Sequence, residues 1–450
     1  MNANINQQHM FSNKMIRALL VPIILEQLLN SIMGTADTMM VSNVGSAAIS
    51  AVSLVDSINI LVIQAFSALA AGGAIVCAQY IGQGNKERAN ESARQVLFII
   101  TLISVAVSAF CLIFQKPLLR LIFGAVEADV MRASEIYFFY TALSFLFIAA
   151  YDAAASIFRA QENTRDPMLI SMVSNVMNIV GNAIMIWGFH MGVAGAALAT
   201  LISRIFCAVV VLAELRLDRQ PIVVRDYLKI RPDGKMIGRI LALGIPSGIE
   251  NSMFQLGKII VLSLVSTFGT YAIAANAVSN AIALFQILPG MAITLAITPV
   301  ISRCVGAGDY EQAKYYNKKL MLITYVSMTA MVLFIFSLLP FILNAYNLSD
   351  LTAKTTADII HFHGIGAIFI WPVAFSLPAT FRAAGDAKAC MYISSISMWI
   401  FRIGFSYVLG KYMGMGVFGI WVAMVIDWVF RAMCFVIRYF KGSWKKNAIV

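Results

Sequence analysis

Residues 22–45 read PIILEQLLNSIMGTADTMMVSNVG, and residues 246–269, which lie 224 positions later, read PSGIENSMFQLGKIIVLSLVSTFG. Both stretches begin with proline, carry glutamate four residues on, and end in glycine after a largely apolar run. A match at about half the length of the 450-residue chain indicates an internal duplication. The sequence therefore predicts two similar halves.

Other pairs of segments keep this offset or one residue less. The turn Gly82-Gln83-Gly84 recurs as Gly306-Ala307-Gly308, and Phe158-Arg159-Ala160 recurs as Phe381-Arg382-Ala383. Because the matches keep their order along the chain, they support the duplication independently of the first pair.

The composition indicates a membrane protein. Hydrophobic residues make up 60% of the chain and charged residues 12%, about half the charged share of a soluble globular protein. Apolar runs of about 20 residues, enough to cross the hydrocarbon core of a bilayer, recur along the chain and are too long for barrel strands. We predict an all-α integral membrane protein with twelve transmembrane helices, at residues 15–41, 47–80, 93–115, 131–157, 167–188, 191–213, 238–266, 271–302, 319–343, 356–381, 389–410 and 414–437.

An even number of spans in each half fixes the relation between the halves. The second half then enters the membrane from the same side as the first, so the two are parallel repeats about an axis along the membrane normal. We expect two six-helix lobes around a central cleft: an N-terminal lobe at 1–213, a cytoplasmic linker at 214–237 and a C-terminal lobe at 238–450. Such lobes expose a cleft to either side of the membrane by rocking.

The basic residues predict the orientation of the chain. Most of the 33 Lys and Arg fall in the N-terminus, the even-numbered loops and the C-terminus. By the positive-inside rule both termini are cytoplasmic, in a multi-pass protein of the cell membrane. The net charge of +11 therefore indicates contact with lipid headgroups and not with nucleic acid.

No pattern of residues typical of an enzyme is found. The sequence contains no P-loop, nucleophile elbow or dinucleotide-binding motif, and no fused segment of soluble-domain composition. The six Cys are scattered, and His361 and His363 have no carboxylate or Cys at metal-ligand spacing. We expect no catalytic residues, no cofactor and no metal site, and therefore work that is driven by ion gradients.

Several segments resemble the multidrug and toxic compound extrusion (MATE) family of transporters. They are PIILEQLLNSIMGTADTMMVSNVG at 22–45, GGAIVCAQYIGQGN at 72–85, FRAQENTRDPM at 158–168, LGIPSGIE at 243–250 and FRAAGDAK at 381–388. The similarity covers essentially the whole chain and falls at corresponding places in both halves. It implies a monomeric secondary active antiporter, which exports organic cationic or amphiphilic drugs or metabolites in exchange for H⁺ or Na⁺. Within the family, the chain resembles either the NorM-like or the DinF-like branch.

Three polar residues share one face of the first span. At 100° per residue, Glu26, Asn30 and Asp37 fall within about 40° of one another, and we expect them to face the cleft. A carboxylate inside a bilayer needs a functional or structural reason, which makes Asp37 the candidate for cation coupling. The MATE resemblance implies the same role, because a family aspartate matching Asp37 is implicated in proton or sodium coupling and in drug release.

The fifth span carries a second polar ladder. Asn175, Asn178 and Asn182 are three and four residues apart, with Ser171 one turn earlier. The ladder either lines a hydrated substrate cavity in the N-terminal lobe or forms hydrogen bonds between helices. Asn182 stands where the DinF-like branch has a second aspartate, so a two-aspartate proton site is not expected.

Glu250 and Lys258 on the seventh span complete the candidate cavity residues. Phe254 stands where the NorM-like branch has a sodium-site glutamate. Glu250 shares its repeat position with Glu26, and the pair has either a symmetric structural role or a cleft-lining one. Lys258 is either the partner of a carboxylate or a charge that repels cationic drugs.

The principal alternative function is that of a lipid-linked saccharide flippase of the same superfamily. A cleft for a pyrophosphate-linked lipid needs several Arg or Lys on the first, second, seventh and eighth spans. Lys258 is the one basic residue in the middle portions of those spans. The sequence therefore favours small-molecule cargo that is cationic or neutral.

Overall fold

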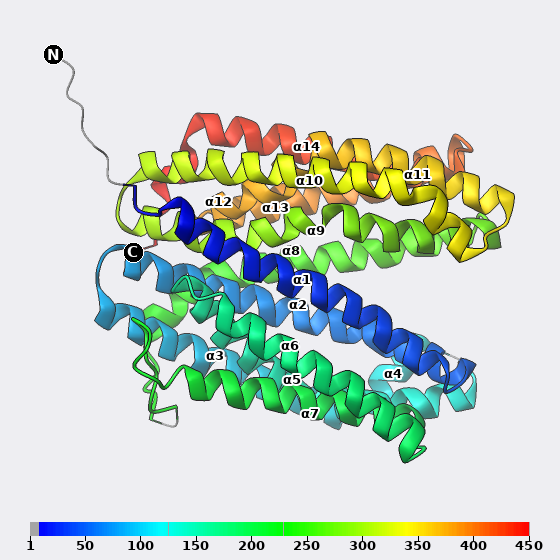
Figure 1. The fold of residues 1–450 in the computed structure, drawn as a ribbon, viewed down its shortest axis with the longest axis horizontal. Helices are drawn as coiled ribbons and strands as arrows, with labels where there is room; N and C mark the ends of the chain where they lie inside the picture. The colour runs from blue at the N-terminus through cyan, green and yellow to red at the C-terminus, as the bar shows by residue number, and fades with distance from the viewer. Residues whose placement is uncertain (1–8, 125, 228, 450) are drawn as a thin grey trace. The chain divides into compact units, whose positions relative to one another are not determined.

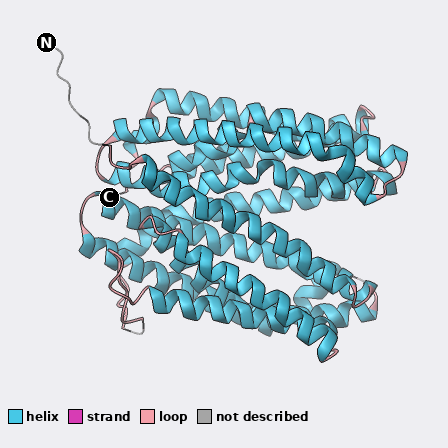
Figure 2. Ribbon diagram, in the orientation of Figure 1, coloured by secondary structure: helices cyan, strands magenta, loops and turns pink. Residues whose placement is uncertain are grey.

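The computed structural model describes residues 9–124, 126–227 and 229–449, and at Thr35, Asp37, Thr38 and Ser42 it describes the backbone alone. Every regular element in these ranges is a helix, as Figures 1 and 2 show. The elements are α1 (Asn13–Ser42), α2 (Ser46–Gly82), α3 (Lys86–Ile113), α4 (Gln115–Phe123), α5 (Ala128–Ala160), α6 (Arg165–Asn182) with η1 (Ala183–Gly188), α7 (Gly192–Glu214), α8 (Gly234–Ser266), α9 (Thr270–Gly306), α10 (Tyr310–Tyr346), α11 (Asp350–Phe369) with η2 (Pro372–Ser376) and α12 (Leu377–Ala383), α13 (Ala387–Ser397) with η3 (Met398–Gly404) and η4 (Ser406–Tyr412), α14 (Gly416–Lys441) and η5 (Ser443–Lys446).

The helices account for all twelve predicted spans. Within the described ranges, ten helices are long and apolar enough to cross a membrane, and the bent pair of α11 with Pro372–Ala383 raises this number to eleven. The remaining predicted span, 238–266, is α8, whose composition is more polar because it carries Arg239, Glu250 and Lys258. The prediction of an all-α membrane fold is thus confirmed.

One helix departs from the predicted continuity. The chain turns by 59° between α11 and the segment that begins at Pro372. Proline has no backbone N–H and its ring clashes with the preceding turn, which bends or breaks a helix. The position 224 residues earlier is Ile148, and there α5 runs without a break from Ala128 to Ala160. The two repeats therefore differ here by the residue that breaks the helix.

By compactness the chain divides into two units. Unit 1 comprises Met1–Ile24, Ala78–Gly84 and Leu256–Val450, and unit 2 comprises Leu25–Cys77 and Asn85–Gln255. The start of α1 thus groups with the second half of the chain, and the start of α8 groups with the first half. The predicted lobes at 1–213 and 238–450 remain a prediction.

These two helix starts pack equivalently within their units. In unit 2, a Cβ on Gly244 of α8 would lie 2.9 Å from the Leu69 side chain, and one on Gly72 would lie 2.7 Å from the Gly244 nitrogen. In unit 1 the residues 224 positions away from these three, Leu20, Ile293 and Ala296, belong to one buried cluster. The duplication is therefore present in the packing as well as in the sequence.

The loop between the repeats is attached to unit 2. The backbone N–H of Ile222 donates to the Gln161 side chain at 2.8 Å, and that of Val223 donates to Asn90 at 2.8 Å. Gln95 Nε2 donates to the carbonyl oxygen of Arg231 at 2.7 Å. Side-chain amides thus satisfy backbone groups of a segment that forms no regular structure.

Candidate functional site

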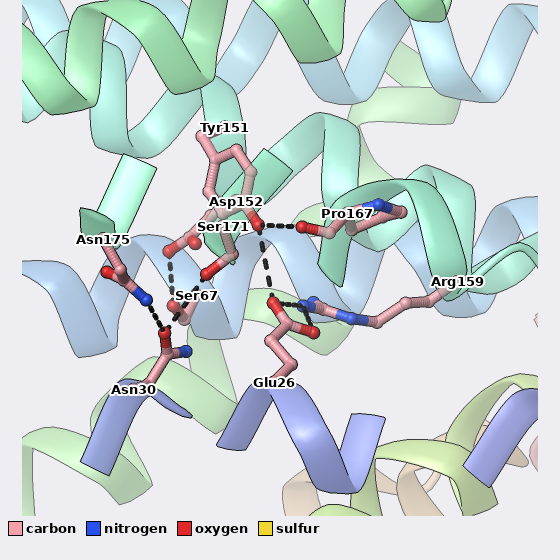
Figure 3. A network of polar contacts seen from close by, with 9 residues as sticks. All are labelled: Glu26, Asn30, Ser67, Tyr151, Asp152, Arg159, Pro167, Ser171 and Asn175. Atoms are coloured by element: carbon pink, nitrogen blue, oxygen red, sulfur yellow. Dashed lines mark hydrogen bonds and ion pairs between the residues drawn. The ribbon is translucent and has the colours of Figure 1, made fainter. Parts of the chain in front are cut away.

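A network of polar side chains lies inside unit 2, contributed by α1, α2, α5 and α6. Figure 3 draws nine of its residues. The helices are otherwise packed through apolar side chains, with Phe145, Ala149 and Ala153 of α5 fully buried. Polar groups in such surroundings must bind one another, because a buried polar group without a partner is costly.

Glu26 is the centre of an ion pair. Its side chain is 3% exposed, and Arg159 Nη2 lies 3.0 Å from Oε1 and 3.2 Å from Oε2. The Tyr151 hydroxyl lies 3.4 Å from Glu26 Oε1 and 3.1 Å from the carbonyl oxygen of Pro167, and donates to these acceptors. Arg159 is in the last turn of α5, where a cation is favoured by the helix dipole. These contacts favour the structural alternative for Glu26 over a cleft-lining one.

Asn30 joins α1 to α6. Its Oδ1 accepts a hydrogen bond from Asn175 Nδ2 at 2.7 Å and another from the Ser171 hydroxyl at 3.1 Å. Asn30 is exposed, Asn175 is half-buried and Ser171 is buried. Both acceptor sites of one amide oxygen are therefore used to hold two helices together.

The remaining asparagines of α6 bind toward α7. Asn182 Nδ2 donates to Asn178 Oδ1 at 3.3 Å, and Asn178 Nδ2 donates to the Thr200 hydroxyl at 3.2 Å. Asn182 is fully buried. Within the predicted ladder, Asn175 thus binds α1, whereas Asn178, which also accepts from Asn182, binds α7.

Asp152 of α5 is a member of the network that is not among the candidate site residues predicted from the sequence. The Ser67 hydroxyl of α2 donates to its Oδ2 at 2.5 Å, and Asp152 is half-buried beside the fully buried Ala153. Its hydrogen-bond partner is thus a neutral group. The repeat gave no signal, because the equivalent positions in the second half are Phe375 and Ser376.

The other candidate residues lie outside this network. Asp37 is on α1, and its side chain is outside the described part of the structure. Glu250 is half-buried and Lys258 is exposed, both on α8, a helix that contributes no side chain to the residues drawn in Figure 3. Within the described ranges the network therefore holds two carboxylates, Glu26 and Asp152.

The chemistry open to this arrangement is proton or cation exchange. Glu26 is engaged with a guanidinium, whereas Asp152 can gain or lose a proton without the breaking of an ion pair. Carboxylate, amide and hydroxyl oxygens are also the ligands that hard cations take. In the described residues, no three His, Cys, Asp or Glu side chains converge as a metal site.

The chain matches a family model and curated proteins over almost its whole length. The MatE family model matches residues 22–184 and 246–408, two segments that are again 224 positions apart. The Bacillus subtilis (strain 168) uncharacterized transporter YisQ is 28% identical over 434 residues, 94% of this chain and 93% of that protein. The probable multidrug resistance protein NorM of Thermotoga maritima is 24% identical and covers 96% of this chain and 93% of its own length. The probable multidrug resistance protein YoeA of Bacillus subtilis is 27% identical, and the match covers 96% of this chain and 94% of that protein.

Solved structures share the fold. A MOP superfamily transporter from Pyrococcus furiosus, described as having a binding pocket of reverse polarity that suggests a different function, superposes with a TM-score of 0.89 at 20% identity. A crystal structure of a MATE protein in the straight conformation superposes with a TM-score of 0.89, and one in the bent conformation with a TM-score of 0.87, both at 21% identity. Each comparison covers 97% of both chains.

Proposed function

This chain belongs to the MatE family, and from that premise we propose that it is a secondary active antiporter, which exports organic cationic or amphiphilic drugs or metabolites in exchange for H⁺ or Na⁺. Members of the family are transporters, so the chain is a multi-pass membrane transporter and not an enzyme. Two of its relatives are named as probable multidrug resistance proteins, which supports drug-like cargo.

The duplicated fold supports alternating access as the transport cycle. Two repeats of the same topology, matched at 22–184 and 246–408, have equivalent packing around the starts of α1 and α8. In transporters built from parallel repeats, one lobe rocks against the other and exposes the substrate site to one side at a time. We propose the same cycle for this chain.

The observation that carries the coupling mechanism is the polar network of unit 2. Among the residues drawn in Figure 3, Arg159 neutralises Glu26, which leaves Asp152, bound by the Ser67 hydroxyl, as the carboxylate whose hydrogen-bond partner is uncharged. Asp152 and Asp37 are therefore the proposed coupling residues. In their ionised form they attract an organic cation, and a proton or Na⁺ that neutralises them releases it outward.

Energetics limit what one coupling ion can do. Exchange of one proton for a neutral solute uses about 2.3 kcal/mol per 100 mV of membrane potential, enough for a solute gradient of roughly 50-fold. Exchange of one proton for a monovalent cation moves no net charge, so it is driven by the pH difference alone. A cationic cargo therefore needs a larger pH gradient or a second ion.

Lipid-linked saccharide export is the second candidate function. The sequence offers Lys258 as the one basic residue in the middle portions of the first, second, seventh and eighth spans. In the described structure Lys258 is exposed and lies two turns along α8 from Glu250. One lysine provides little neutralisation for a pyrophosphate, so export of small organic molecules is the better supported function.

Efflux of ethidium from cells that lack their own pumps tests the proposal. Wild type, Asp37→Asn and Asp152→Asn are compared at equal membrane expression, with and without a protonophore or a Na⁺ gradient. We expect wild-type efflux to fall at least tenfold in Asp37→Asn and in Asp152→Asn, because neither amide can be ionised. Asp358→Asn, which removes an exposed carboxylate from α11, is the matched control and should export normally.

Two results contradict the proposal in different ways. Full efflux by both Asn variants removes these aspartates from the coupling mechanism. Absence of wild-type efflux across several cationic and neutral dyes, in cells whose viability depends on lipid-linked saccharide export through this chain, supports the flippase.

A further inference from the structure

A second group of charged side chains lies within unit 1, on α13, η3 and α14. Asp427 is fully buried, and Arg431, one turn later and 3% exposed, donates from Nε to its Oδ1 at 2.9 Å. The Ser397 hydroxyl also donates to Asp427 Oδ1, and Arg431 Nη2 donates to the carbonyl oxygen of Ser394 at 3.3 Å. The pair is a closed structural unit in which the charges of Asp427 and Arg431 cancel.

Arg402 adds a second guanidinium to this group. It lies on η3, which packs along α14, and within electrostatic range of both Asp427 and Arg431. Its Nε is buried and has no hydrogen-bond partner in the described structure. Because Arg431 already engages the one carboxylate, the group has two guanidiniums and a net charge of +1.

The neighbouring helix brings a further cation toward Arg402. A Cβ on Gly257 of α8 would lie 2.0 Å from the methyl group of Met398, so the Met398 side chain of η3 packs directly on α8 at this glycine. Lys258 is the next residue after Gly257, Arg402 is one turn after Met398, and the two charges interact. Lys258 is exposed, Arg402 half-buried and Arg431 buried, so the positive charge extends from the surface of the unit to its interior.

Asp427 is the one carboxylate in the segments η3 and α14 that carry Arg402 and Arg431. Between Leu256 and Val450 the other acidic residues lie in turns or in the first turns of α10 and α11, except Asp358, which is exposed in the third turn of α11. A guanidinium without a counterion has a free-energy cost in the middle of a membrane span. An anion bound at Arg402 would remove that cost.

We propose that Arg402, with the field of Lys258 and Arg431, binds the anionic group of an amphiphilic molecule, a carboxylate, sulfonate or phosphate. A planar guanidinium binds such groups through two parallel hydrogen bonds. Apolar contacts are provided nearby by Phe375, over which Arg431 lies at 5.3 Å, and by Trp428. Asp427 Oδ2 is also buried without a hydrogen bond among the described residues, and a water that accompanies the anion can donate one there.

This inference extends the proposed function: a role of the anion site in transport rests on the proposal that the chain is a transporter of organic molecules. Unit 2 presents carboxylates and amides, whereas this region of unit 1 is basic. A transporter with both regions accepts zwitterionic and anionic amphiphiles besides cations. The same anionic chemistry is found in a transported solute and in the headgroup of an anionic lipid.

The test is binding of 11-(dansylamino)undecanoic acid to purified protein in nanodiscs of phosphatidylcholine, with its primary amide as the uncharged probe. Wild type should bind the acid about tenfold more tightly than the amide, which corresponds to about 1.4 kcal/mol. Arg402→Gln should bind both probes equally, and Arg402→Lys should keep part of the preference. Lys354→Gln, which removes an exposed positive charge from α11 of the same unit, should behave like wild type.

Equal affinity of wild type for acid and amide, or an undiminished preference in Arg402→Gln, overturns the proposal. If Arg402→Gln does not fold, competition in wild type decides: laurate should displace the acid, and an equal effect of lauramide contradicts an anion site. Native mass spectrometry distinguishes the sources, because a phosphatidylglycerol retained by wild type and to a smaller extent by Arg402→Lys identifies a lipid headgroup, and its absence from wild type identifies a solute. None of these measurements depends on transport, so failure of ethidium efflux and failure of the anion site are separate results.

Discussion

Glu26 is held on both carboxylate oxygens, by Arg159 at 3.0 and 3.2 Å, and approached by the Tyr151 hydroxyl at 3.4 Å. Two opposite charges removed from water stabilise a fold little in themselves, since their attraction mainly offsets desolvation. Removal of one partner is different, because it leaves the other charge buried and unpaired. Loss of stability is therefore expected to be large when either Glu26 or Arg159 is replaced alone, and much smaller when both are replaced.

We expect Glu26→Gln and Arg159→Gln each to lower the free energy of unfolding by about 3–5 kcal/mol. The double variant should cost clearly less than the sum, because it leaves no unpaired charge. Reversible unfolding in mixed detergent micelles measures all three. Glu311→Gln, which breaks the exposed pair with Lys314, is the control and should lower the free energy of unfolding little, because solvent screens this pair. Additive losses as small as that of the control would contradict a coupled buried pair.

Part of the network was predictable from residue spacing. Asn175, Asn178 and Asn182 follow helical spacing, and the structure joins Asn178 to Asn182 and Asn175 to Asn30. Asp152 was not predictable as the partner of Ser67, because that contact joins two helices whose relative rotation no single-helix pattern specifies. Glu26 and Glu250 are alike in sequence, yet Glu26 is buried and Glu250 half-buried, a difference that depends on the neighbouring helices.

At the scale of elements, α2 and α9 meet at two repeat-related glycines within unit 1. A Cβ on Gly82 would lie 2.1 Å from the carbonyl oxygen of Arg303, and one on Gly306 would lie 2.0 Å from that of Gln79. Arg303 lies 224 positions after Gln79, as Gly306 does after Gly82, so the contact is symmetric about a local two-fold axis. Glycine is required at both positions because backbone is what a side chain would meet.

Gly82→Ala and Gly306→Ala should each destabilise the protein by at least about 2 kcal/mol, since overpacking against backbone forces the helices apart. Thermal unfolding followed by size-exclusion chromatography measures the effect. Gly238→Ala in α8 is the matched control: nothing lies within 4 Å of its Cβ, and we expect no loss or a gain of up to about 1 kcal/mol. If all three variants melt together, the close approach of α2 and α9 is not limiting for stability.

The order and approximate positions of the helices followed from the sequence, while their ends and interruptions did not: α10 begins at Tyr310 and not at residue 319, and α3 at Lys86 and not at residue 93. Each predicted span coincides with a helix because apolar length and the need to satisfy backbone groups in lipid leave no other choice. The bend before Pro372 is a property of one residue in one repeat, and prolines elsewhere, such as Pro299 in α9, lie inside helices that continue. Whether a proline breaks a span depends on which neighbours satisfy the freed carbonyl groups.

At the scale of the whole molecule, the distribution of basic residues predicts the orientation. A membrane-impermeant maleimide should label Arg219→Cys, in the loop between the repeats, only after the cells are permeabilised. The same reagent should label Glu127→Cys, before α5, in intact cells. Both positions are exposed, and among the native cysteines five are buried and Cys434 is half-buried. Wild type therefore gives the background. Labelling of Arg219→Cys in intact cells would reverse the predicted orientation.

The exchange of helix starts links the halves of the chain. Residues up to Ile24 group with unit 1, and residues 234–255 group with unit 2, where Gly244 packs on Leu69. Each half of the sequence thus supplies part of the apolar core of the other unit. Burial of apolar surface in lipid gains little by itself, so these contacts act through close packing of small residues.

Because of this exchange, fragments 1–219 and 220–450 should copurify when they are coexpressed, and neither should be stable alone. The break lies in an exposed turn, and the second fragment keeps Ile222 and Val223, whose backbone binds Gln161 and Asn90 of the first. A second fragment shortened to 256–450 lacks the exchanged start of α8 and these loop contacts, and should copurify in smaller amount through the contacts of α1 with unit 1 that remain. If fragment 1–219 is stable and monodisperse without its partner, the halves are independent domains. Packing of the α8 start on the first half then does not contribute to the stability of that half.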